Sequence, residues 1–209
     1  MRFAWIDEPP FNYVEDGRLR GRDVELAQRA FAAIGEEFEP VETEFGELLG
    51  GLSDGRWDVT TGMFITQERM ARAAFTRPIW SLRDGLLVRQ DWASRVTGYR
   101  SLAAMRARLA VLRGQMQIQT ALRCGVRQSD LMMFDRYADA ADAVLQGTAT
   151  AYASVELAHV EHIGRSGNAS LVCIPVQDDE KLPDVGGFAC ASVSVRDRLN
   201  AALELLLKL

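Results

Sequence analysis

The stretch Asp58-Val-Thr-Thr-Gly-Met-Phe-Ile-Thr-Gln-Glu-Arg69 is the part of the sequence that decides how the rest is interpreted. It begins with residues typical of a strand, which we expect to open into a loop at Gly62. Thr66 is a favourable N-cap for a helical turn that carries Arg69. Such a bend exposes backbone N–H groups, and these bind an anionic ligand well when a bidentate arginine lies beside them. The stretch therefore predicts an anion-binding site that contains no nucleophile.

Strand patterns alternate with helix patterns on both sides of this stretch. In residues 23–34 apolar side chains recur at helical spacing, and Gly35 is typical of the residue that follows a helix. Residues 109–112 form a short apolar run typical of a buried strand, and a helix pattern begins at about Gln117. This alternation predicts an α/β fold with largely parallel sheets.

The composition excludes several classes of protein. The chain has 209 residues, of which 48% are hydrophobic and 25% charged, as in ordinary globular proteins. Its formal net charge of -5 argues against a nucleic-acid-binding surface, which requires a basic patch. An apolar run of about 18 residues is missing, so no membrane-spanning helix is expected. A strand pattern starts directly at Arg2 without a signal peptide, so either the protein is cytoplasmic or an export signal has been removed.

The sequence lacks the motifs of common enzyme and metal-binding classes. It has no GxSxG, P-loop, GxGxxG or HExxH motif. His159 and His162 lie one turn apart on a predicted helix. Because no second cluster completes a metal site, we expect them on an exposed helix face. Neither a metal nor a cofactor is therefore expected.

Two further groups of residues receive structural interpretations. The acidic run at residues 178–180 is expected to be a solvated loop tip. The cysteines form no metal-binding cluster and are expected to be small buried residues, although one disulfide remains open if the protein is exported. They are Cys124, Cys173 and Cys190.

A series of short motifs occurs in a definite order in the first part of the chain. The motifs are Glu8-Pro-Pro-Phe-Asn-Tyr13 and residues 16–26, 45–52, 55–59, 62–69 and 75–78. In order and spacing they resemble the substrate-binding proteins of polar amino-acid ABC transporters, the bacterial solute-binding proteins of family 3. From residue 95 onward the match is looser, but Arg113-Gly114 between a strand and a helix, and residues 149–153, fit a second lobe.

The resemblance implies the two-lobed fold of type II periplasmic binding proteins, in which each lobe is a mixed sheet flanked by helices. Residues 1–86 and 188–209 would form lobe 1, and residues 87–187 would form lobe 2. The segments 85–88 and 187–191 would be the two crossover strands. Proteins of this kind hold their ligand in the cleft between the lobes and close by a hinge motion.

The resemblance also implies ligand-binding positions, carried over one residue at a time. Arg69 would bind the ligand carboxylate, with help from the backbone N–H of Met63 beside Gly62. Phe45 occupies the position of an aromatic wall. In lobe 2 the corresponding positions, at the start of a helix, are Gly114, Gln115 and Met116.

Two positions depart from the pattern of proteins that bind ordinary α-amino acids. Phe64 stands where a second threonine or serine is usual. The region that normally carries an aspartate for the α-ammonium group reads Ala153-Ser154-Val155-Glu156 here, so Ser154 is the candidate that remains at this position. A standard anchor for an α-ammonium group is therefore not expected.

These departures suggest an aromatic box. Phe11, Phe45 and Phe64, with Trp5 nearby, would surround a cation to which Glu8 adds a negative charge. Such a box suits a delocalised or alkylated cation, because cation–π attraction replaces directional hydrogen bonds. In these features the sequence resembles the ectoine-binding branch of the family. The alternative is that Phe11 and Phe64 only pack the interior of the lobe.

The resemblance implies the solute-binding protein of an ABC importer, which captures a polar amino acid or an ectoine-like zwitterion. It would act as a monomer with the transporter permease as partner, without nucleic acid, and would be periplasmic or extracellular and lipid-anchored. It would not be an enzyme. Two alternatives stay open: a cyclohexadienyl dehydratase-like enzyme, for which Glu8 is the candidate general acid, and a ligand-sensing domain cut from a receptor or kinase.

Overall fold

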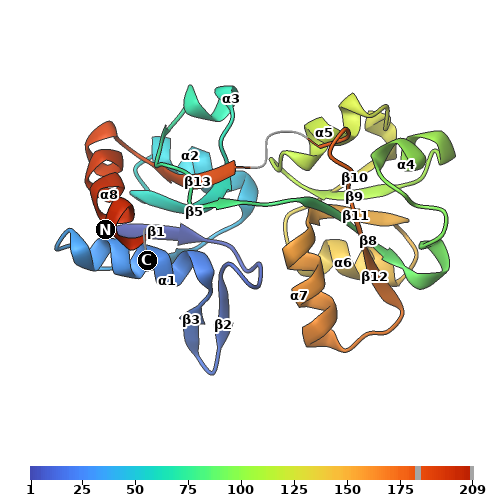
Figure 1. Ribbon diagram of the computed structural model, residues 1–209, viewed down its shortest axis with the longest axis horizontal. Coiled ribbons are helices and arrows are strands. Elements are labelled where there is room, and N and C mark those ends of the chain that lie inside the picture. Colours follow the sequence, from blue (N-terminus) through green and yellow to red (C-terminus); the bar gives the residue numbers. More distant parts are fainter. Residues whose placement is uncertain (182–184, 208–209) are drawn as a thin grey trace. The chain divides into compact units, whose positions relative to one another are not determined.

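The computed structural model describes residues 1–181 and 185–207 and shows an α/β protein made of two compact units (Figure 1). Unit 1 comprises residues 1–81 and 183–209, and unit 2 comprises residues 82–182. The two-lobed α/β class expected from the sequence is therefore confirmed. The lobe boundaries proposed above follow residues 86 and 187, whereas the units change after residues 81 and 182. Each unit is described by itself.

Unit 1 contains a six-stranded mixed sheet in the order β4-β1-β5-β13-β6, with β7 also paired to β13. Its strands are β1 (Arg2–Trp5), β4 (Glu39–Glu42), β5 (Val59–Phe64), β6 (Ala74–Phe75), β7 (Trp80–Ser81) and β13 (Val185–Cys190). The first three are parallel, and β13 runs antiparallel to β5, β6 and β7. A separate hairpin joins β2 (Tyr13–Glu15) to β3 (Arg18–Arg20).

The helices of unit 1 cover its sheet on two sides (Figure 1). They are α1 (Arg22–Ala33), α2 (Leu48–Ser53), α3 (Gln67–Met70) and α8 (Val193–Leu206), with a 3₁₀ turn at Phe45–Glu47. Successive strand residues point to opposite faces. Phe3 accordingly packs with Phe31 of α1 and Leu199 of α8, whereas Ala4 packs with Leu48 of α2. We call these two clusters the α1/α8 core and the α2 core.

Unit 2 contains a five-stranded mixed sheet in the order β10-β9-β11-β8-β12. Its strands are β8 (Asp84–Arg89), β9 (Leu109–Leu112), β10 (Leu131–Phe134), β11 (Ala151–Val155) and β12 (Leu171–Pro175). β9, β10 and β11 are parallel, and β8 runs antiparallel to β11 and β12. The helices are α4 (Tyr99–Met105), α5 (Gln117–Arg123), α6 (Tyr137–Leu145) and α7 (Glu156–Ser166), with 3₁₀ turns at Gln90–Trp92 and Gln128–Asp130.

The structure corrects the expected crossover strands and the expectation of largely parallel sheets. All six residues of β8 belong to the sheet of unit 2, where its partners are β11 and β12, and β13 belongs to the sheet of unit 1. Neither strand is shared between units, because each forms its ladder within one sheet. These two strands also make both sheets mixed, since each runs antiparallel to a neighbour from the parallel set.

His159 is buried, which overturns the expectation of an exposed histidine pair. Its side chain is 0% exposed, and its Nδ1 forms a 2.7 Å hydrogen bond with the hydroxyl of Tyr137. The ring also packs edge-on against Tyr152 of β11. Burial lowers the pKa of His159 to about 3, so the imidazole is neutral. The half-buried His162 packs against Tyr137, and the described residues contain no group of three metal-ligating side chains.

Glu180 is also buried, although Asp178 and Asp179 are exposed as expected for a loop tip. The Oε2 of Glu180 accepts a 2.5 Å hydrogen bond from the backbone N of Tyr99. Tyr99 is the first residue of α4, so the carboxylate satisfies an N–H group at the positive end of that helix. Glu180 therefore caps a helix that begins 81 residues earlier.

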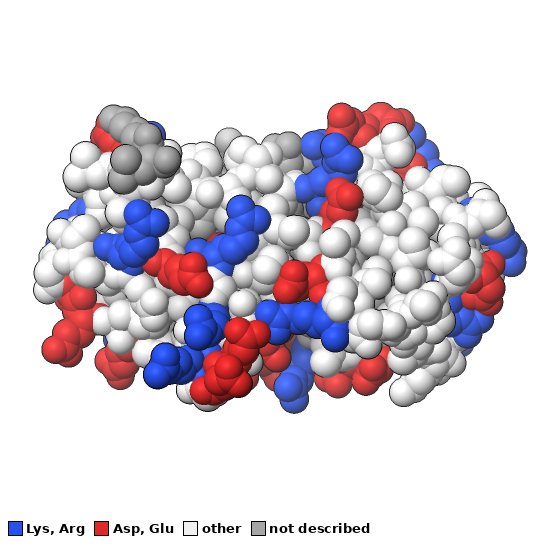
Figure 2. Space-filling model, turned by 60° about the horizontal axis from the view of Figure 1, so that its bottom comes forward, with Lys and Arg blue, Asp and Glu red and all other residues white. Residues whose placement is uncertain are grey.

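The surface and the cysteines are unremarkable in the described structure. On the face seen in Figure 2, basic and acidic side chains are interspersed, without one large patch of either sign. Cys190 is buried and Cys124 and Cys173 are partly buried, and none of the three is in a disulfide. Among the described residues, no helix combines the length and the apolar character needed to cross a membrane.

Replacing Glu180 by alanine should destabilise unit 2. The Tyr99 N–H would lose its partner inside the protein, which costs about 1–3 kcal/mol of unfolding free energy. Thermal unfolding measures the loss. The control is Asp178→Ala in the same loop, where an exposed carboxylate is removed and a change below about 0.5 kcal/mol is expected. Equal effects of the two variants would contradict the capping role.

Candidate functional site

β5 runs through Gly62 and ends at Phe64, so the expected glycine loop is wrong. The backbone N of Gly62 donates a 2.8 Å hydrogen bond to Oδ2 of Asp23. A Cβ at position 62 would lie 2.6 Å from Nε1 of Trp80 and 2.8 Å from that carboxylate oxygen. Glycine is thus needed for close approach by two side chains and not for a turn, since its φ is not positive.

Arg69 lies where the sequence predicts it, in the short helix α3 directly after β5. Thr66 is the N-cap, and its hydroxyl accepts from the backbone N of Arg69 at 3.2 Å. Arg69 is 7% exposed, and its Nη1 donates a 2.8 Å hydrogen bond to the carbonyl of Phe64. Its Cζ lies 5.4 Å from the ring centroid of Phe45. Strand end, guanidinium and aromatic ring are therefore joined in one cluster.

Burial changes the electrostatics of this arginine. It lowers the pKa of Arg69 to about 10, because the charged form loses hydration, while neighbouring Glu68 acts in the opposite direction. The group still carries a positive charge at neutral pH. A guanidinium presents five N–H groups in a planar fork, which matches the two oxygens of a carboxylate. The bond to Phe64 holds this fork at the carboxyl end of β5.

The aromatic residues of the predicted box do not form one group. Phe64 packs edge-on against Trp80, with ring centroids 5.3 Å apart, and Phe11 packs against the same indole at 6.3 Å. Phe45 lies instead beside Arg69. Trp5 belongs to the α1/α8 core, because it points to the same face of β1 as Phe3. Trp5 is thus placed in the interior, and the ring that contacts both Phe11 and Phe64 is Trp80, which the sequence analysis did not consider.

A buried polar cluster lies behind Phe64. Asp23, in the first turn of α1, accepts a 2.9 Å hydrogen bond from the hydroxyl of Thr61 in addition to the bond from Gly62. The same hydroxyl accepts a 2.8 Å bond from the side-chain amide of Asn12. Burial raises the pKa of Asp23 to about 6, although the bonds from Thr61 and Gly62 act to lower it. This carboxyl group therefore titrates close to neutral pH.

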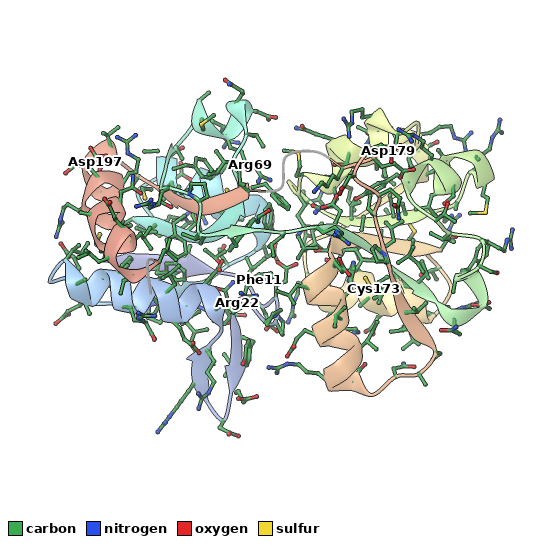
Figure 3. All side chains as sticks on the ribbon, viewed as in Figure 1. Phe11, Arg22, Arg69, Cys173, Asp179 and Asp197 are labelled. Atoms are coloured by element: carbon green, nitrogen blue, oxygen red, sulfur yellow. The ribbon has the colours of Figure 1, made fainter. Side chains whose placement is uncertain are left out.

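The loop at residues 8–12 is attached to the start of α1. The backbone N–H groups of Arg22 and Asp23 donate to the carbonyls of Pro10 and Phe11 at 3.0 and 3.1 Å, and Phe11 and Arg22 lie close together in Figure 3. Glu8 is buried, and its backbone N donates to the carbonyl of Asn12 at 2.9 Å. The candidates Glu8 and Phe11 are thus held in fixed positions beside β5.

Met63 contributes its side chain to the α2 core, where it packs with Ile6, Leu48 and Trp57. Only its backbone is left for the predicted contact with a ligand. The backbone of Met63 lies opposite Gly187 in the ladder between β5 and β13. The role assigned to its N–H group remains a prediction.

In unit 2 the candidate loop follows β9. Gly114 has a φ of 80°, which favours glycine, and the side chains of Gln115 and Met116 are buried. Gln117, the first residue of α5, donates a 2.8 Å hydrogen bond from Nε2 to Asp84 at the start of β8. Ser154 is buried near the end of β11. The loop is therefore anchored to the sheet through Gln117.

In each unit, candidate residues lie at or after the carboxyl ends of parallel strands. In unit 1 they follow the carboxyl ends of parallel strands: Glu8 and Phe11 come after β1, Phe45 after β4, and Arg69 after β5. In unit 2, Gly114 follows β9 and Ser154 lies near the carboxyl end of β11, which is parallel to β9. Ligands of open α/β sheets bind beyond these strand ends.

Comparison with known proteins identifies the family. Residues 2–208 match the family of bacterial extracellular solute-binding proteins, family 3. The chain belongs to this family. The resemblance found in the sequence is therefore confirmed over the full length, including the part after residue 95 where the motifs are sparse.

Three proteins similar to this chain differ in function and in how much of the chain they match. The probable amino-acid ABC transporter periplasmic-binding protein y4tE of Sinorhizobium fredii is 29% identical over 97% of this chain and 71% of its own length. The structure of EhuB in complex with hydroxyectoine superposes with a TM-score of 0.91, covering 99% of this chain and 82% of that one at 22% identity. Cyclohexadienyl dehydratase of Pseudomonas aeruginosa is 37% identical, but over only 38% of this chain and 30% of its own length.

Replacing Asp23 by asparagine should change the pH dependence of stability. The pKa of Asp23 in the folded protein, about 6, exceeds its ordinary value of 3.8, so this group destabilises the fold as the pH rises through that interval. Asparagine mimics the protonated form and still accepts from Thr61 and Gly62. Relative to the unaltered protein, the variant should gain about 3 kcal/mol between roughly pH 4 and 7.5.

Chemical denaturation at several pH values measures this difference. Asp178→Asn removes one exposed carboxylate and serves as the control for the loss of a charge. If the stabilities of Asp23→Asn and the unaltered protein followed parallel curves over this range, Asp23 would not be the titrating group.

Proposed function

We propose that this protein binds a small zwitterionic solute, either a polar amino acid or an ectoine-like compound, and delivers it to an ABC importer. The observation that carries the proposal is the arrangement of Arg69, whose buried guanidinium is fixed by the Phe64 carbonyl and lies beside Phe45. Membership in a family of solute-binding proteins supports it, as does the relative described as a probable amino-acid ABC transporter periplasmic-binding protein.

The anionic end of the ligand would bind at Arg69. A buried guanidinium has already lost much of its hydration, so a carboxylate that approaches it forms charge-assisted bonds without displacing a full water shell. The bond to Phe64 and the cap by Thr66 fix its direction before a ligand arrives. For unit 2, considered by itself, the strand-end rule points to Gly114, Gln115, Met116 and Ser154 as further contacts.

The cationic end would lie toward Phe11 and Phe64, with Glu8 as the nearby acidic residue. An aromatic surface favours a cation whose charge is spread over several atoms, as in a cyclic amidine or an alkylated amine. The likeness to EhuB shows the fold alone, and the hydroxyectoine in that structure makes an ectoine-like ligand a reasonable candidate here.

The proposed setting follows from the family. We place the protein in the periplasm or outside the cell, as a monomer whose partner is a transporter permease. A ligand-sensing domain of a larger receptor would use the same binding chemistry. The sequence encoded beyond this chain distinguishes the two, because a signalling module would replace the export signal.

A thermal-shift screen of polar amino acids, ectoines and betaines should find one compound that raises the melting temperature, because a ligand that binds only the folded state stabilises it. For that compound, Arg69→Ala and Arg69→Lys should both weaken binding by about 30-fold or more, since a point charge does not replace the guanidinium fork. Arg72→Ala, an exposed residue of the same segment, should leave affinity unchanged. Calorimetry measures all three, and retained affinity in Arg69→Ala would overturn the assignment.

The local similarity to cyclohexadienyl dehydratase favours one alternative, an enzyme on the same fold. Glu8 is its candidate general acid, because it is a buried carboxyl group beyond the end of β1. Incubation with prephenate or arogenate should give no turnover if the protein only binds its ligand. Turnover that disappears in Glu8→Gln, while that variant keeps its melting temperature, would support the enzyme instead.

A further inference from the structure

We propose that Trp80 determines the specificity of the cationic end of the site, and that Gly62 and Gly186 are glycines because its indole lies on them. The inference rests on the proposed function and names a residue that the sequence motifs do not assign. Trp80 is the first residue of β7, and its backbone pairs with Gly186 of β13.

The two glycines define where the indole lies. A Cβ at Gly186 would be 2.0 Å from Cη2 and 2.1 Å from Cζ3, so the six-membered ring covers this position. A Cβ at Gly62 would be 2.6 Å from Nε1 and 3.0 Å from Cε2, so the five-membered ring covers that one. Glycine inside a strand lowers its stability, and two such positions under one side chain indicate that the place of the ring matters.

Trp80 connects the aromatic residues assigned to the cation. Its ring contacts Phe64 edge-on, at an interplanar angle of 88°, and contacts Phe11 at 46°. The indole offers a larger electron-rich face than phenylalanine and is the best cation–π partner among the aromatic side chains. A change in the position of the indole would therefore move both neighbouring rings and alter the surface that a cation meets.

Simple packing of the interior does not account for this arrangement. Trp80 is only partly buried, and it belongs neither to the α1/α8 core nor to the α2 core. Its Nε1 is buried next to the carboxylate of Asp23, and this N–H group acts to lower the pKa of that carboxyl group. The ring is therefore held by the Asp23 carboxylate together with its contacts with the two glycines and the two phenylalanines.

The test uses Gly186→Ala. The three atoms nearest to a Cβ at this position all belong to Trp80, so the variant displaces the indole without altering it. The readout is the ratio of the dissociation constants for ectoine and for L-glutamine, measured by calorimetry. Both Gly186→Ala and Trp80→Ala should change this ratio by about 10-fold or more. The control is Gly164→Ala in α7, where a Cβ meets open space and the ratio should stay the same.

A double variant separates specificity from general damage. If Gly186→Ala acts through the indole, then adding it to Trp80→Ala should change the ratio no further, because the two effects are not additive. Trp80→Phe serves in the same cycle if Trp80→Ala lowers the melting temperature strongly. An unchanged ratio in Trp80→Ala, or fully additive effects, would overturn the inference while the proposed function stands. If the unaltered protein bound neither probe nor any other zwitterion, the proposed function itself would fail and this inference with it.

Discussion

The buried carboxylate of Asp23 is the interaction on which the candidate site depends. It joins the first turn of α1 to the middle of β5 through Thr61 and Gly62, and Asn12 attaches the preceding loop to the same hydroxyl. A carboxylate in the interior is unfavourable unless its hydrogen bonds are made, so these bonds fix β5 relative to α1 within narrow limits. The positions of Met63 and Phe64, which follow Gly62 on β5, therefore depend on this cluster.

Phe64, at the end of β5, contacts the residues proposed for both ends of the ligand. Its carbonyl oxygen orients the guanidinium of Arg69, and its ring packs against Trp80. Under the proposed function, the group for the ligand carboxylate and the aromatic surface for its cation both contact Phe64. One residue thus contacts both groups, Arg69 through its backbone and Trp80 through its ring.

The sequence was sufficient where the determining contacts are local. The helix at residues 23–34 corresponds to α1, and Thr66 caps α3 as its position before a helical turn predicts. It was insufficient where a distant segment decides the outcome. The sequence around Gly62 predicts a loop, because the indole that requires the glycine comes from β7. The sequence around Glu180 predicts a solvated tip, because the helix that Glu180 caps begins at the distant Tyr99.

The polar character of His159 likewise suggests an exposed position. The side chain is buried because Tyr137 of α6 and Tyr152 of β11 contact it, and both are distant in the sequence. The motifs that identify the family succeeded because they are short and ordered along the chain. The residue now expected to tune the site, Trp80, has no such motif. The sequence shows only that positions 62 and 186 are glycines. The pairing of β13 with β5 and β7, which brings both glycines under the indole, is visible only in the fold.

Tyr99 has a consequence for how the chain assembles. Its hydroxyl donates to Asp84, near the first residue of unit 2, and its backbone N donates to Glu180, near the last. Both ends of the inserted unit are thus bound to one residue. For unit 1 the whole insertion acts as a loop that folding of unit 2 has already closed, so the entropy lost when β13 joins β5 is smaller than for a flexible chain of that length. Folding of the inserted unit thereby favours completion of the sheet whose strand β5 leads into α3 and Arg69.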